Sequence, residues 1–84
     1  MLKDKLRQMP ARVRISYQGC GEQQFADERR FEAQHGVRIA ESRDAGFDAN
    51  RIVVLEDVET GERVSVTGFH PAWELYIYPQ QVAS

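Results

Sequence analysis

The chain has 84 residues, of which 42% are hydrophobic and 29% are charged, with a formal net charge of −2. This length allows one hydrophobic core, so we expect a single domain over residues 1–84, and the composition argues against an intrinsically disordered chain. The longest apolar run, residues 52–55, is too short to cross a bilayer. A single cysteine, Cys20, excludes an internal disulfide and suits a reducing compartment. We therefore expect a soluble cytoplasmic protein.

The first predicted element is a short helix over residues 2–9. Leu2, Leu6 and Met9 recur at helical spacing on one side. Pro10 ends this helix, because proline disfavours helical backbone in the residue before it. The first 14 residues also carry five basic side chains against one acidic one, which is +4 and leaves −6 on the rest of the chain. Such a basic segment could contact phosphates or lie as a solvated face.

A strand is predicted over residues 12–17, where apolar and polar side chains alternate. The following segment, residues 22–36, is ambiguous. Good helix formers over residues 26–35 end at Gly36, which suits a helix C-terminus, and this favours a helix. However, Phe25 and Phe31 are six positions apart, which fits one face of a strand better than one stripe of a helix. Both interpretations stay open.

Three further segments complete the predicted elements. Residues 37–40 are predicted to form a short strand, and residues 42–50 a polar loop with Gly46 at its centre. Near the end of the chain, a turn over residues 68–71 precedes a last alternating strand, residues 73–78. Five short strands with turn signals between them predict an α+β fold, mostly antiparallel, with a small curled sheet or partly open barrel and one or two short helices.

Residues 51–68 predict a β-hairpin around the turn at residues 58–62. Gly61 occupies the turn position that needs a positive φ angle. With Val58 opposite Glu62, one face of the hairpin is apolar and the other is mixed, as a half-buried antiparallel sheet requires. This register pairs Glu56 with Val64, Val54 with Val66 and Ile52 with Gly68 on one face, and Asp57 with Arg63, Leu55 with Ser65 and Val53 with Thr67 on the other. The period-2 pattern then predicts a core made of Val13, Ile15, Ile52, Val54, Val64, Val66, Leu75 and Ile77.

No combination of residues predicts a catalytic or metal site. Cys20, His35 and His70 are scattered, and no pair has the close spacing that usually seeds a zinc site. The acidic residues at the hairpin tip are expected to keep it soluble. We therefore predict no catalytic residues, no metal and no cofactor. The acidic residues concerned are Glu56, Asp57, Glu59 and Glu62.

The last strand carries the predicted interface. Tyr76 and Tyr78 lie on the face opposite Trp73, Leu75 and Ile77, so if the second set faces the core, the two tyrosines point away from it. The tyrosines either form an exposed interface or pack under a helix, and both alternatives stay open. A core this small gains from self-association, so the leading hypothesis is a non-enzymatic binding or assembly module that forms homo-oligomers. Its expected interface residues are Tyr76, Tyr78, Trp73 and Phe69.

Residues 50–68 resemble the strand and tip sequences of Sm-like proteins, through the runs Asn-Arg-Ile-Val-Val-Leu-Glu-Asp-Val-Glu at residues 50–59 and Val-Ser-Val-Thr-Gly at residues 64–68. The resemblance implies a short helix before five bent strands of an SH3-like barrel, and single-stranded RNA as a partner. An aspartate and an asparagine of that family's RNA-contacting loop correspond to Asp48 and Asn50, whereas its arginine-glycine pair is Thr67-Gly68 here. The alternative hypothesis is thus RNA binding, supported by Tyr17 and by Lys3, Lys5, Arg12, Arg14, Asp48 and Asn50.

The last strand also resembles that of the small plasmid-type (type II) dihydrofolate reductases, which have a related barrel. Their closing strand follows a His-Pro turn and ends in Ile-Tyr-Pro, as do residues 70–71 and 77–79 here. A glutamine that lines the pore of that family is replaced by Tyr76, and its active-site lysine has no counterpart. The resemblance therefore implies the barrel, and we expect no NADPH-dependent reduction of dihydrofolate.

Overall fold

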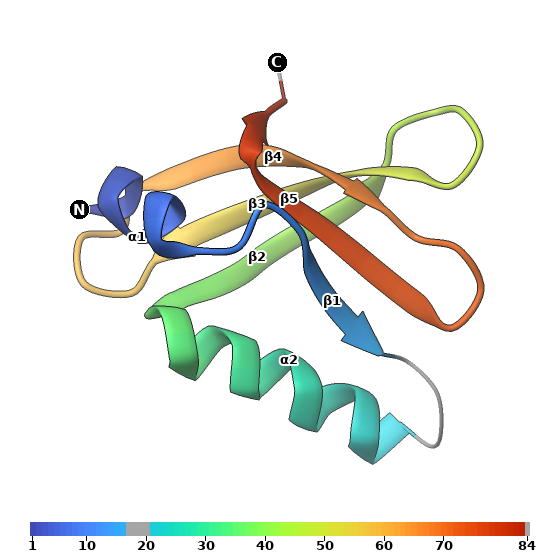
Figure 1. Cartoon of the computed structure of the whole chain (residues 1–84), viewed down its shortest axis with the longest axis horizontal. Helices are drawn as coiled ribbons and strands as arrows, with labels where there is room; N and C mark the ends of the chain where they lie inside the picture. The colour runs from blue at the N-terminus through green and yellow to red at the C-terminus, as the bar shows by residue number, and fades with distance from the viewer. Residues whose placement is uncertain (17–20, 84) are drawn as a thin grey trace.

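The computed structural model describes residues 1–16 and 21–83, with the backbone alone for residues 21–25. Within this part of the chain, two helices and a curled, five-stranded antiparallel sheet form an α+β half-barrel (Figure 1). Tyr17 and Cys20 lie outside the described residues. The elements in chain order are α1 (Leu2–Gln8), β1 (Val13–Ser16), α2 (Gly21–His35), β2 (Val37–Asp44), β3 (Asn50–Asp57), β4 (Arg63–Phe69) and β5 (Glu74–Val82).

The strands lie in the order β1-β5-β4-β3-β2, and every neighbouring pair is antiparallel. Strands β2 to β5 follow one another through the sheet, whereas β1 joins at the far side of β5. The two edge strands, β1 and β2, therefore come from either end of α2, and this helix packs against both of them. Figure 1 shows α2 running below the sheet, with α1 beside the turn between β3 and β4.

Both helices form where their sequences favour them. The helix predicted over residues 2–9 is confirmed as α1, which ends at Gln8. The three apolar residues that predicted it, Leu2, Leu6 and Met9, are all buried. Residues 21–35 form a helix, which decides between the two interpretations of that segment. Phe31 anchors this helix in the core, and Gly36, with a φ of +67°, ends it. Neither helix of the described residues is long and apolar enough to cross a membrane.

Strand β2 is longer than predicted. It runs through Asp44, so the expected loop over residues 42–50 shortens to the residues between Asp44 and Asn50. The last four residues of β2 are exposed and polar, because β2 is an edge strand, and they lack the alternation that marks a half-buried strand. A bulge between Ile39 and Glu41 also breaks the pattern.

The predicted register of the β3–β4 hairpin is wrong by one residue. The Asp57 N–H donates to the Glu62 carbonyl at 2.8 Å, so Asp57, not Val58, lies opposite Glu62. The loop has four residues instead of three, and Gly61 still adopts the predicted positive φ, +77°. A shift of one residue turns every side chain of a strand to the other face of the sheet. The observed pairs include Val53 with Val66 and Leu55 with Val64.

This shift changes the composition of the core. Val53 and Leu55 are fully buried in it, whereas Ile52 and Val54 lie on the opposite face, Ile52 half-buried and Val54 buried outside the main cluster. Ile15, Val66, Leu75 and Ile77 are in the core as predicted, with Val13 and Val64 packed at its margin. The remaining core residues are Leu2, Leu6, Met9, Phe31 and Val37.

Candidate binding surface

The candidate surface begins on the outer face of the sheet, which is the face opposite the core. Alternation along β4 and β5 places Phe69, Tyr76 and Tyr78 there, half-buried, while Ile77 points inward. Phe69 is directly opposite Tyr76 across the two strands. Both helices pack their apolar side chains into the core, on the inner face of the sheet. Within the described residues, no helix therefore covers the outer face.

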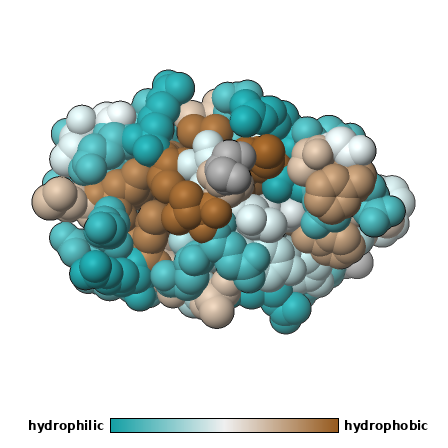
Figure 2. Space-filling view, turned by 90° about the horizontal axis from the view of Figure 1, so that it is seen from above, coloured by the Kyte–Doolittle hydropathy of each residue, from teal (hydrophilic) through white to brown (hydrophobic). Residues whose placement is uncertain are grey.

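Two loops extend this group of aromatic residues at one end of the sheet. The His70 N–H donates to the Ala49 carbonyl at 2.7 Å, which joins the β4–β5 turn to the β2–β3 loop. Trp73 in the turn and Phe47 in the loop are each 64% exposed. Figure 2 shows apolar atoms at this end of the molecule. We call Phe47, Phe69, Trp73, Tyr76 and Tyr78 the aromatic surface.

The structure thus brings three of the four predicted interface residues onto one face, and the fourth, Trp73, lies in the turn between β4 and β5. Trp73 does not belong to the last strand, which begins at Glu74. Its positive φ of 73° is strained for a residue with a side chain and marks the turn. Phe47 was missed by sequence reasoning, although a large apolar residue between Gly46 and Asp48 in a polar loop is a detectable signal of an exposed contact.

Tyr76 is held in place by a charged network. Its hydroxyl donates to one carboxylate oxygen of Glu74, and Arg14 donates to the other, from Nε at 2.8 Å. The Arg12 guanidinium lies 4.9 Å from the centre of the Tyr76 ring, a cation–π distance. The hydrogen bonds from Tyr76 and Arg14 lower the pKa of Glu74, and the bond to Glu74 raises the pKa of Tyr76. The Tyr76 hydroxyl is therefore already hydrogen-bonded within the protein, to Glu74.

Some of the predicted RNA-contacting residues come together with the aromatic surface. Arg14 lies opposite Tyr76, and Asn50 lies opposite Phe69, so one row crosses the four strands β1, β5, β4 and β3. Asp48, with a φ of +51°, is in the adjoining loop. The row combines a cation, two aromatic rings and an amide on one face of the sheet.

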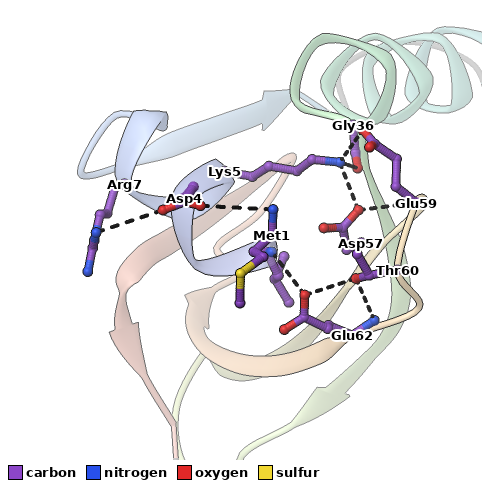
Figure 3. Close-up of polar contacts among 10 residues, drawn as sticks. Met1, Asp4, Lys5, Arg7, Gly36, Asp57, Glu59, Thr60 and Glu62 are labelled. Carbon is purple, nitrogen blue, oxygen red and sulfur yellow. Dashed lines mark hydrogen bonds and ion pairs between the residues drawn. The ribbon is translucent and has the colours of Figure 1, made fainter.

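Lys3 and Lys5 do not join that row. Both are on α1, at the opposite end of the sheet from the β2–β3 loop (Figure 1). Lys3 is exposed. Lys5 is bound at three oxygens: its Nζ donates to Asp57 Oδ1 at 2.7 Å, to the Gly36 carbonyl at 2.9 Å and to Glu59 Oε1 at 3.1 Å (Figure 3).

Asp57 is the buried partner of this ion pair. Sequence reasoning assigned it to a solvated hairpin tip, but the residue is only 1% exposed, because the corrected register turns it inward. Its Oδ1 also accepts the Glu59 N–H at 2.9 Å, and its Oδ2 has no hydrogen-bond partner among the described residues. The hydrogen bond from Lys5 is the main reason that the pKa of Asp57 is lowered and that of Lys5 is raised. This pair ties α1 to the hairpin and to the end of α2.

A second charged group lies at the hairpin end of the outer face. Glu56 accepts from Arg63 at 2.8 Å and from Arg38 at 2.7 Å, and these bonds lower its pKa. With Arg14 and Glu74 at the other end, the outer face carries both signs of charge in bonded pairs. This arrangement favours no strongly acidic or strongly basic partner over the sheet as a whole.

The described residues contain no group of three His, Cys, Asp or Glu side chains that could hold a metal ion. His35 lies against Phe31, with ring centres 5.2 Å apart, and His70 Nδ1 is 2.9 Å from the Pro71 carbonyl oxygen. Ile77 is fully buried and Pro79 is buried beside it, so the Ile-Tyr-Pro strand end has only Tyr78 on the outer face. Comparison of the chain with protein-family models, with curated proteins and with solved structures found no match.

Proposed function

We propose that this protein is a non-enzymatic binding module that associates with a second copy of itself through the aromatic surface. The observation that carries the proposal is the Phe69–Tyr76 pair on an outer sheet face, flanked by Trp73 and Phe47 at 64% exposure. Aromatic residues are enriched in protein interfaces, and tryptophan and tyrosine are frequent among the few residues that carry most of the binding energy.

The state of Tyr76 supports this proposal. Its hydroxyl and ring are already ordered by Glu74 and Arg12, so little side-chain entropy remains to be lost on binding. The paired charges of the outer face support a second copy as the partner. In a two-fold interface the same patch meets itself, and a face of matched positive and negative groups avoids the repulsion that a single sign would cause.

We also infer that the curled sheet belongs to the SH3-like class. A short helix before five bent antiparallel strands is the plan implied by the resemblance to Sm-like proteins. Helix α2, between β1 and β2, is an addition to that plan and closes the gap between the two edge strands.

Light scattering over a concentration series tests self-association. We expect the wild-type mass to rise above that of one chain, and Trp73→Ser to weaken the association at least tenfold, because a buried tryptophan in an interface commonly contributes about 2 kcal/mol or more. Val58→Ser is the matched control, because Val58 is 61% exposed at the other end of the sheet. A monomer at all concentrations, unchanged by Trp73→Ser or Tyr76→Ala, would contradict the proposal.

Single-stranded RNA binding is the second candidate, and the row from Arg14 to Asn50 favours it. Bases stack on aromatic rings, and each stacked base contributes about 1–3 kcal/mol. We expect a fluorescein-labelled oligouridine to bind at low salt, with an affinity that falls as the salt concentration rises. Arg12→Ala should reduce the slope of log affinity against log salt concentration by about one, because one cation fewer contacts the phosphates. Lys3→Ala, on the opposite end of the sheet, is expected to change little. The absence of binding at low salt would end this interpretation.

A further inference from the structure

Two loops at one end of the sheet hold the unusual backbone conformations of this protein. Among the described residues, positive φ angles outside glycine occur only at Asp48, +51°, and at Trp73, +73°. Asp48 lies in the loop of residues 45–49, between β2 and β3, and Trp73 lies in the turn of residues 70–73, between β4 and β5. Figure 1 shows both at the same end of the sheet. We call residues 45–49 and 70–73 together the loop end.

The two positive φ angles differ in their cost. Aspartate adopts the left-handed region fairly often, because its short polar side chain can hydrogen-bond to nearby backbone. Tryptophan has no such compensation, and in this region its Cβ is too close to the following carbonyl oxygen. A glycine would adopt the same φ without strain. Trp73 therefore occupies a position where having a side chain makes the fold less stable.

Backbone hydrogen bonds hold the loop end in this conformation. In the first loop, the Ala45 N–H donates to the Asn50 carbonyl at 3.0 Å, and the Asn50 N–H donates to the Phe47 carbonyl at 3.2 Å. Across Trp73, the Glu74 N–H donates to the Pro71 carbonyl at 3.5 Å. The hydrogen bond described above joins the loop to the turn. Strained residues persist where the surrounding structure determines their conformation in this way, and they are frequent at binding sites.

The loop end also carries the most exposed side chains of the aromatic surface. Phe47 and Trp73 are each 64% exposed, whereas Phe69, Tyr76 and Tyr78 are half-buried on the sheet. Tyr76 is also already in contact with other side chains of its own chain. A side chain that is exposed in the free protein has the most apolar area to bury on binding. The loop end therefore offers more area per residue than the sheet.

We propose that Trp73 and Phe47 are the principal contacts of the aromatic surface with a second copy of the chain, and that the strain at Trp73 is retained because its ring is needed there. This assignment rests on the proposed self-association, for which the bonded charge pairs of both signs favour a second copy as the partner. The hydrogen-bonded loops fix the backbone that carries both rings, so little backbone freedom is lost on binding.

Replacing Trp73 by glycine separates the strain from binding. We expect Trp73→Gly to raise the midpoint of thermal unfolding by about 4–8 °C, at a protein concentration where every variant is monomeric. Trp73→Ser removes the ring but keeps a Cβ, so it should bring little of this gain. Val58→Gly is the matched control at an exposed position without a positive φ. It should lower the midpoint, because glycine there only adds freedom to the unfolded chain.

Light scattering over a concentration series then measures binding by the same variants. We expect Trp73→Gly, Trp73→Ser and Phe47→Ser each to weaken self-association at least tenfold, because a few residues carry most of the binding energy of an interface. Tyr78→Ser, on the half-buried sheet face, should weaken it by about threefold or less. Trp73→Gly would thus be the more stable protein and the weaker binder.

Three results would overturn the proposal, and they are distinguishable. A midpoint for Trp73→Gly no higher than that of the wild type would show that position 73 is not strained. Wild-type self-association that Trp73→Gly and Phe47→Ser leave unchanged would show that the contact lies elsewhere, while self-association itself would stand. A wild type that is monomeric at every concentration would overturn the proposed function and this contact with it, whatever the melting temperatures of the variants.

Discussion

Replacing Lys5 by methionine is expected to lower the midpoint of thermal unfolding by about 10–20 °C. The reason is that Asp57, 1% exposed, would keep its charge in the core without the Lys5 ammonium, which lies at 2.7 Å. Removing one partner of a buried pair costs much more than the pair itself contributes, because the other charge stays desolvated. The 18% exposure of the Lys5 side chain places the effect below that of a fully buried pair.

Lys3→Met is the matched control, because Lys3 is on the same helix but exposed, and we expect a change of no more than a few degrees. The double variant Lys5→Met with Asp57→Asn should be more stable than Lys5→Met alone, since it also removes the unpaired charge. Equal melting temperatures for Lys5→Met and Lys3→Met would show that the ion pair does not stabilise the fold.

The stability that Lys5→Met loses relative to the wild type is expected to depend on pH, and the two pKa shifts give the direction. Because the pKa of Asp57 is lowered in the folded protein, its contribution to folding stability is fully present above the pKa of an unfolded aspartate, about 3.9. This contribution is lost as the pH falls through the pKa of Asp57 in the folded protein. The raised pKa of Lys5 means that its contribution is present below the unfolded value, about 10.4, and is lost as pH rises through the folded one. The stability difference between wild type and Lys5→Met should therefore be largest between about pH 4 and pH 10, and it should shrink in acid as Asp57 becomes protonated.

Leu55→Ala is the second change with a large expected effect. Leu55 is fully buried between the sheet and the helices, and truncating such a leucine costs about 2–5 kcal/mol in the free energy of unfolding. Ile52→Ala, in the same strand but half-buried on the outer face, should cost less than half as much. Urea unfolding of both variants, at one protein concentration and with unchanged slopes, gives the comparison.

This comparison also distinguishes the two registers of the β3–β4 hairpin. In the register predicted from sequence, Ile52 faces the core and Leu55 the other side, so Ile52→Ala would be the more harmful change. In the observed register the order is reversed. A larger loss for Ile52→Ala than for Leu55→Ala would therefore contradict the structure of this hairpin.

The sequence alone determined the elements whose signals are local. The spacing of Leu2, Leu6 and Met9 marked α1, and the alternation around Ile15 and Leu75 marked their strands, because helical and strand periodicities are properties of neighbouring residues. The positive φ at Gly61 was likewise predictable, because only its own backbone conformation is involved. For the candidate surface, the outward position of Tyr76 and Tyr78 followed from the same alternation.

Only the tertiary structure decided the features that depend on distant partners. A hairpin loop of three or four residues fits the same turn sequence, so the register had to be set by what each face packs against. Burial of Asp57 requires Lys5, 52 residues away in the chain, and no local pattern reveals that pairing. Phe47 and Trp73 lie in two loops that are far apart in the sequence and are joined by the backbone hydrogen bond from the His70 N–H to the Ala49 carbonyl.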